Sequence, residues 1–79
     1  MIVNVLAFGI AKEIFGGPSI TVELPGITVA DLKTSLELSY PKLKALASYL
    51  VAVNNEYAGD DLLLDIRDEV AIIPPVSGG

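Results

Sequence analysis

The stretch ITVADL, residues 27–32, decides how this chain folds, because it holds the clearest helix start in the sequence. Thr28 is of a residue type that caps helices, and Asp31 stands three positions later, where its carboxylate can accept from unpaired N–H groups. Apolar residues then recur at helical spacing and predict a buried stripe. The stripe comprises Val29, Leu32 and Leu36. We therefore expect one main helix packed against a hydrophobic core.

Proline ends this helix. Pro41 disfavours helical geometry in the residue before it, and it can open a short second helix to about Ala47. Residues 49–54 are expected to form a strand, because they are rich in β-branched and aromatic residues. Asn54-Asn55 tolerates left-handed backbone and predicts a turn, with a brief return strand at Glu56-Tyr57.

Upstream, residues 2–8 predict a strand close to the centre of a sheet, since their sole polar residue is Asn4. Side chains alternate across a strand, so Asn4 marks the outer face. The core-facing residues are then Val3, Val5 and Ala7. Leu6 and Phe8 should lie beside Asn4, which leaves two large apolar side chains facing outward.

Residues 19–24 alternate polar and apolar side chains and predict a half-buried strand, antiparallel to the first. Between the two strands, glycines frame residues 11–15. We expect this segment to form about one helical turn within a connection, not an element of its own.

Composition narrows the chemistry. The chain has 79 residues, 52% of them hydrophobic, which is consistent with one small domain over residues 1–79. It contains no Cys and no His, which removes thiol nucleophiles, imidazole bases and the usual transition-metal ligands. The net charge of −5 argues against nucleic acid and favours partners with a basic surface.

Five of the ten acidic residues fall between Asp60 and Glu69, around the triplet Leu62-Leu63-Leu64. We interpret this segment as a solvated connection whose leucines plug the core. A metal site at Asp60, Asp61 and Asp65 is conceivable, but no EF-hand spacing is present. We therefore expect no metal and no cofactor bound by this chain.

The chain ends in an apolar run, residues 70–73, followed by PPVSGG. Two prolines end strand pairing and stiffen the chain, so residues 73–79 are expected to form a projecting tail. Its stretch from Pro74 to Gly79 reaches on the order of 20 Å. The tail to be inserted into a partner comprises Pro74, Pro75, Val76, Ser77 and Gly78. Its final carboxylate, on Gly79, is the predicted reactive group, because a carboxylate can form covalent intermediates.

These elements predict an α+β fold in which a helix crosses one face of a mixed sheet. The first and last strands are the natural central pair, and a right-handed crossover makes them parallel. One helix covers one face, so Leu6, Phe8 and Ile73 should be left on the other as a docking surface beside the tail.

The chain resembles the molybdopterin synthase small-subunit (MoaD-type) family of ubiquitin-like β-grasp sulfur carriers. The resemblance covers essentially the whole length, and the terminal PPVSGG is its most specific motif. Weaker motifs are Lys12-Glu13, Leu24-Pro25, Tyr40-Pro41, VAVN at residues 51–54 and DEVA at residues 68–71. Lys12 stands where Arg is more usual, and Arg67 stands where the family usually has Gly before an Asp-Glu pair.

The resemblance implies a cycle of sulfur transfer. An E1-like adenylating enzyme, using ATP and Mg²⁺, would adenylate Gly79, and a sulfur donor protein would convert it to a thiocarboxylate. The tail would then enter the molybdopterin synthase large subunit and donate sulfur to a cyclic pyranopterin precursor. The partner interface would include Leu6, Phe8, Lys12 and Ile73.

Two other functions stay open. The same tail chemistry serves sulfur carriers for thiamine synthesis or transfer-RNA thiolation, and it also serves ubiquitin-like modifiers that end in an isopeptide bond. A plain interaction domain is a third reading. The apolar start lacks the basic region of a signal peptide, and no apolar run approaches membrane-spanning length. We therefore expect a cytoplasmic protein with no membrane partner.

Overall fold

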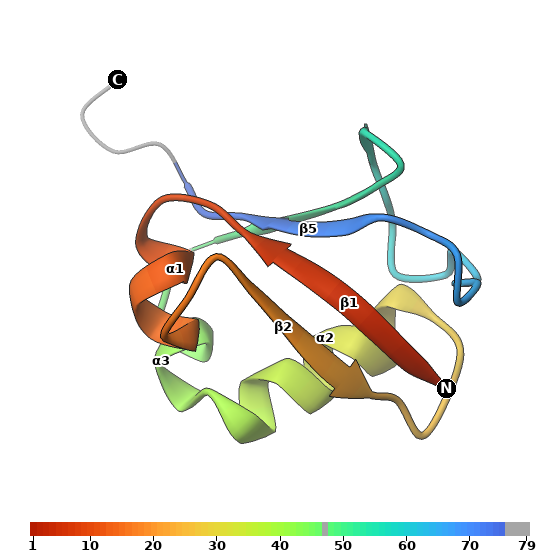
Figure 1. Cartoon of the computed structure of the whole chain (residues 1–79), viewed down its shortest axis with the longest axis horizontal. Helices are drawn as coiled ribbons and strands as arrows, with labels where there is room; N and C mark the ends of the chain where they lie inside the picture. Colours follow the sequence, from red (N-terminus) through yellow and green to blue (C-terminus); the bar gives the residue numbers. More distant parts are fainter. Residues whose placement is uncertain (47, 76–79) are drawn as a thin grey trace.

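The computed structural model describes residues 1–46 and 48–75. Within them, strands and helices follow one another in the mixed order of an α+β domain (Figure 1). The elements are β1 (Ile2–Ala7), α1 (Ile10–Phe15), β2 (Ser19–Glu23), α2 (Val29–Ser39), α3 (Pro41–Lys44), β3 (Leu50–Val53), β4 (Glu56–Tyr57) and β5 (Val70–Ile73).

The strands form one mixed sheet in the order β2-β1-β5-β3-β4. β1 and β5 pair in parallel, with Val5 opposite Val70, whereas β1–β2, β3–β5 and β3–β4 are antiparallel. The predicted parallel pairing of the first and last strands is therefore confirmed. Figure 1 shows the helices α1, α2 and α3 gathered on one side of this sheet.

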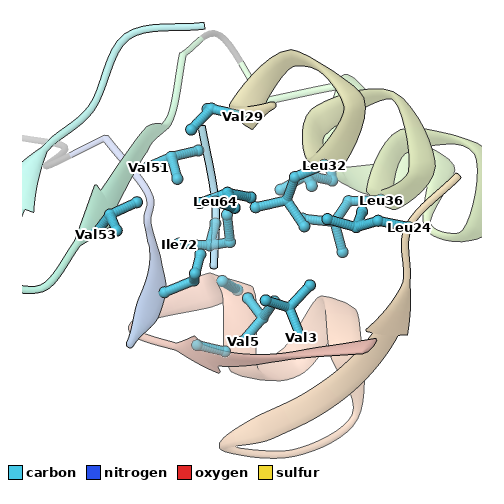
Figure 2. Close-up of a cluster of buried hydrophobic side chains, with 14 of the residues drawn as sticks. Val3, Val5, Leu24, Val29, Leu32, Leu36, Val51, Val53, Leu64 and Ile72 are labelled. Atoms are coloured by element: carbon cyan, nitrogen blue, oxygen red, sulfur yellow. The ribbon is translucent and has the colours of Figure 1, made fainter. Parts of the chain in front are cut away.

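The core lies between that side of the sheet and α2. Side chains from β1 and from α2 point toward one another across it (Figure 2). The fully buried residues on these two elements are those predicted: Val3 and Val5 on β1, and Val29, Leu32 and Leu36 on α2. Each such side chain contributes about 1.5–3 kcal/mol when it is buried, so these residues set the orientation of the helix on the sheet.

The start of α2 forms the predicted capping box. The Asp31 N–H donates to Thr28 Oγ1 at 3.2 Å, and the Thr28 N–H donates to Asp31 Oδ2 at 3.1 Å. The N–H of Ile27 donates to the same Oδ2 at 3.0 Å. Gly26 packs so closely that a Cβ there would lie 2.0 Å from Asp31 Oδ2. A side chain at position 26 would therefore have to displace the Asp31 carboxylate from the capping box.

Pro41 opens α3 as expected, although α3 ends at Lys44, earlier than predicted. The third strand is also shorter than predicted, at residues 50–53. The hairpin turn is confirmed, because Asn54 and Asn55 both adopt positive φ, at 53° and 70°. The Asn54 side chain also pins this turn to the start of β5, since its Oδ1 accepts the Glu69 N–H at 3.0 Å.

Two expectations are wrong. Residues 10–15 form a helix, α1, and not a mere connection, because Ala11 and Phe15 bury one side of it. The Phe15 ring meets the Tyr40 ring edge-on, with centroids 4.8 Å apart. Of the three consecutive leucines only Leu64 enters the core, whereas Leu62 and Leu63 are exposed. A bridge between Thr28 and Leu63 turns the Leu63 side chain away from the core.

Candidate functional site

The structure describes only the first part of the predicted tail. The structure describes Pro74 and Pro75, which follow Ile73 directly. The other predicted tail positions, Val76, Ser77, Gly78 and the reactive Gly79, lie outside the described residues. The candidate site in the described chain is therefore the surface from which the tail departs.

Pro74 packs against the turn between β1 and α1, and we call this contact the tail root. Gly9 in that turn has φ 56° and ψ −133°, a conformation that disfavours a side chain. A Cβ on Gly9 would lie 3.1 Å from Pro74 Cγ. A groove of about 490 Å³ runs along the root, lined by Phe8, Gly9, Ile10, Leu46, Ile73, Pro74 and Pro75. Ile73 and Pro74 therefore do not project as expected, because Ile73 is the last residue of β5 and Pro74 packs on the domain. The contact at Pro74 sets where the chain leaves the domain.

On the sheet face opposite the helices, β1, β3, β4 and β5 carry an apolar patch that we call the outer face; it comprises Leu6, Phe8, Leu50, Ala52, Tyr57, Ala71 and Ile73. Strand register places Leu6 beside Ala71, Ala71 beside Ala52, and Ile73 beside Leu50. A hollow of about 310 Å³ on this face is lined by Phe8, Ala52, Asn55, Tyr57, Glu69, Ala71 and Ile73. Phe8 is 48% exposed and Leu50 is 49% exposed. The outer face is thus a concave apolar surface that continues into the tail root.

The structure brings together three of the four predicted interface residues. Leu6, Phe8 and Ile73 lie on the outer face, as the alternation in β1 and β5 predicts. Phe8 and Ile73 line both the hollow and the tail-root groove. Lys12 lines neither of them. It is exposed on α1, and no carboxylate of the described residues lies within ion-pair distance of it.

Sequence reasoning missed several residues of this surface. Leu50 and Tyr57 contribute large exposed apolar area from β3 and β4, and Ile10 and Leu46 contribute from the helical side of the tail root. The sequence pattern could have identified Leu50, because side chains along β3 and along its neighbour β5 alternate between the core and the outer face. Ile10 and Leu46 carry no such signal, since their positions follow from how α1 and α3 pack.

Several polar side chains of the described residues make contacts within the fold. Lys33 Nζ lies 2.8 Å from an oxygen of Asp60, and the Tyr49 hydroxyl donates to Glu37 at 2.5 Å. Burial, together with this hydrogen bond, raises the pKa of Tyr49. Among the described residues no group of three potential ligands could hold a metal ion, and Asp60, Asp61 and Asp65 do not converge.

Arg67, which replaces the usual glycine of the resemblance, sits in a turn that does not need one. The Asp68 N–H donates to the Asp65 carbonyl at 3.0 Å, and the Arg67 N–H donates to Asp65 Oδ1 at 2.9 Å. The backbone hydrogen bond from Arg67, aided by its side chain, lowers the pKa of Asp65. Positive φ among described non-glycine residues occurs only at the Asn54-Asn55 turn, so Arg67 has ordinary backbone geometry.

Comparison with known proteins places this geometry in context. The chain matches the ThiS family over residues 5–79. It is 42% identical to the molybdopterin synthase sulfur carrier subunit of Arabidopsis thaliana, over 98% of this chain and 82% of that protein.

Solved structures share the fold. A putative molybdopterin converting factor subunit 1 from Pyrococcus furiosus superposes with a TM-score of 0.86 at 29% identity, covering 96% of this chain and 99% of that one. The small archaeal modifier protein 1 from Methanosarcina acetivorans has a TM-score of 0.82 at 30% identity, covering 99% and 96%. None of the described helices is long and apolar enough to cross a membrane.

Proposed function

Because the chain belongs to the ThiS family, in the group of molybdopterin synthase sulfur carrier subunits, we propose that the terminal carbonyl of Gly79 carries the sulfur. The observation that carries this proposal is the 42% identity to such a subunit over 98% of the chain. The role of the chain is thus that of a sulfur carrier in molybdenum cofactor biosynthesis.

The chemistry of the chain supports the terminus as the reactive position. Without Cys or His, no side chain can hold sulfur as a persulfide or act as an imidazole base. The Gly79 carboxylate would attack the α-phosphorus of ATP, releasing pyrophosphate and leaving an acyl-adenylate. A persulfide of a donor protein would then displace AMP and form an acyl disulfide with Gly79. A second thiol of the donor protein would attack the donor's own sulfur in this bond, which leaves a thiocarboxylate on Gly79 and a disulfide on the donor. ATP and Mg²⁺ belong to the E1-like activating enzyme in this scheme.

Sulfur delivery would take place in the molybdopterin synthase large subunit. The thiocarboxylate sulfur would displace an oxygen substituent from a carbon of the pyranopterin precursor and form a thioester. Water would then cleave the acyl–sulfur bond, which leaves the sulfur on the precursor and restores the carboxylate of Gly79. Two such transfers would complete the dithiolene. The outer face would dock on the large subunit while the tail root directs residues 74–79 into its channel. Lys12 would lie at the rim of this contact, and the cycle would run in the cytoplasm.

The test is intact-mass analysis of the purified chain after incubation with the activating enzyme, ATP and a sulfur donor. We expect one oxygen to be exchanged for sulfur, and fragmentation should place the change on Gly79. Adding the large subunit and the pyranopterin precursor should return the original mass and yield molybdopterin. A sulfurated chain that yields no molybdopterin would instead favour thiamine or transfer-RNA thiolation, and an unchanged mass would overturn the proposal.

A second candidate is protein modification, which the match to a small archaeal modifier protein favours. Activation would be the same, but the adenylate would end as an isopeptide bond to a lysine of a target. Immunoblots of cell extracts distinguish the two outcomes. A ladder of bands that disappears when the two terminal glycines are deleted would establish conjugation, whereas a single free species agrees with sulfur transfer alone.

A further inference from the structure

The outward edge of β2 carries unpaired backbone groups. Among the described strands, β2 lies at the edge of the sheet and pairs with β1 alone. The Ala7 N–H donates to the Pro18 carbonyl at 2.8 Å, and the Leu24 N–H donates to the Met1 carbonyl at 2.7 Å. In an antiparallel ladder, bonded residues alternate with residues whose backbone groups point outward. The outward set on β2 is Ser19, Thr21 and Glu23. These three residues offer a ready-made template for another strand.

A groove beside this edge offers apolar contacts. It has a volume of about 360 Å³ and lies between β2 and α2, with Val22 on one wall and Leu38 and Tyr40 on the other. Leu38 is 79% exposed, although the neighbouring position Leu36 is fully buried. Figure 1 shows β2 and α2 together at this side of the molecule. An added strand would therefore gain side-chain contacts as well as backbone hydrogen bonds.

β2 itself has the pattern that fits this site. Its sequence, SITVE, alternates so that Ile20 and Val22 face the helical side while Ser19, Thr21 and Glu23 are exposed. An antiparallel copy centred on Thr21 would place Ile20 beside Val22 of its mate and Ser19 beside Glu23. Every outward N–H and C=O would then find a partner, and no like charges would face each other. This self-complementarity is what a two-fold interface requires.

We propose that two copies of this chain associate through the β2 edge, with the strands antiparallel about a two-fold axis at Thr21. Pro25, the next position of the outward set after Glu23, has no N–H to donate to a new ladder, which limits pairing beyond the C-terminal end of β2. Leu38 of each copy would be covered where the two α2 helices approach beneath the joined sheets.

The distribution of charge is compatible with this pairing. Glu56 lies on β4, at the opposite edge of the sheet, and Asp68 and Glu69 bond to the Asn54 turn beside it. Much of the net negative charge therefore lies away from the proposed axis, where repulsion is screened within about 10 Å at moderate salt. The outer face and the tail root remain open in the dimer, so the association does not compete with the proposed function.

Sedimentation velocity of the full chain, from micromolar to millimolar concentration, tests the proposal. We expect a concentration-dependent dimer that Ser19→Glu weakens and Ser19→Lys strengthens, because each change acts twice, opposite Glu23 of the mate. A shift of roughly 2- to 30-fold in the dimer Kd corresponds to ordinary cross-strand pair energies. Ser48→Glu and Ser48→Lys are the matched controls, since Ser48 is an exposed serine outside the β2 edge; neither should move the Kd.

Two further measurements locate the interface. Thr21→Pro should abolish the dimer and leave the circular dichroism spectrum unchanged, because the Thr21 N–H takes no part in the β1–β2 ladder. Amide exchange at Thr21 should slow as wild-type concentration rises. A chain that is monomeric at millimolar concentration overturns the proposal. So does a dimer that ignores the changes at Ser19 but dissociates with Phe8→Ala, since that dimer would use the outer face.

Discussion

Replacing Phe8 by alanine should separate docking from folding. Phe8 is 48% exposed in the free chain, so about half of its 150–250 Å² of side-chain surface, or roughly 100 Å², remains for a partner to cover. At about 25 cal/mol per Å² this corresponds to roughly 2.5 kcal/mol. The entropy cost of ordering side chains on association reduces this contribution. We therefore expect Phe8→Ala to lose at least about 1 kcal/mol of binding free energy, which is about a fivefold rise in Kd.

Calorimetric titration of the molybdopterin synthase large subunit with the unsulfurated chain measures this loss. Leu63→Ala is the matched control, because Leu63 is 63% exposed but lies beside the start of α2, away from the outer face. Its affinity should equal that of the wild type. A Phe8→Ala chain that binds as tightly as the wild type would refute docking through the outer face. One that is unfolded in isolation would show that Phe8 serves the core instead.

Three other changes test the chemistry, the rim and the helix cap. Deleting Gly79 should leave a folded chain that supports no ATP–pyrophosphate exchange, because the carboxylate retreats by about 3.3 Å; wild-type exchange would remove Gly79 from the reaction. Lys12→Ala should slow association with the large subunit and reduce its salt dependence, and unchanged rates in stopped-flow would place Lys12 outside the contact. Hydrogen bonds from Thr28 lower the pKa of Asp31. The ionised Asp31 carboxylate therefore stabilises the fold fully above the pKa of about 3.9 that it has in the unfolded chain. This stabilisation is lost as the pH falls through its lower pKa in the folded chain. Asp31→Asn should flatten this acid limb in urea titrations, and an unaltered limb would contradict the assignment.

The sheet and α2 could be predicted because their signals are local. The alternation in residues 2–8 assigned both faces of β1 correctly, and the capping pair Thr28 and Asp31 located the start of α2 to the residue. These patterns depend on side-chain direction and on backbone hydrogen bonds within a few residues. The outward placement of Leu6, Phe8 and Ile73 followed from the same alternation.

The features that escaped prediction depend on long-range packing. α1 has six residues, too few to be stable alone. It is stabilised by packing of Phe15 against the Tyr40 ring. Leu63 is exposed because its backbone pairs with Thr28, which is distant in sequence. The tail-root contact of Pro74 with Gly9 likewise joins residues 65 positions apart. No local sequence pattern predicts such contacts, so only the structure reveals them.

The position of β5 has a mechanical consequence. This strand runs straight into Pro74, and it is held on one side by β1 and on the other by β3. A force that draws the tail along the strand axis loads both ladders in shear, so several hydrogen bonds must fail together instead of one after another. An edge strand such as β2 or β4 is held on one side only, so the same force would break its hydrogen bonds one after another. The domain should therefore resist unfolding when a force pulls on its C-terminal end, as when the tail is withdrawn from a narrow channel.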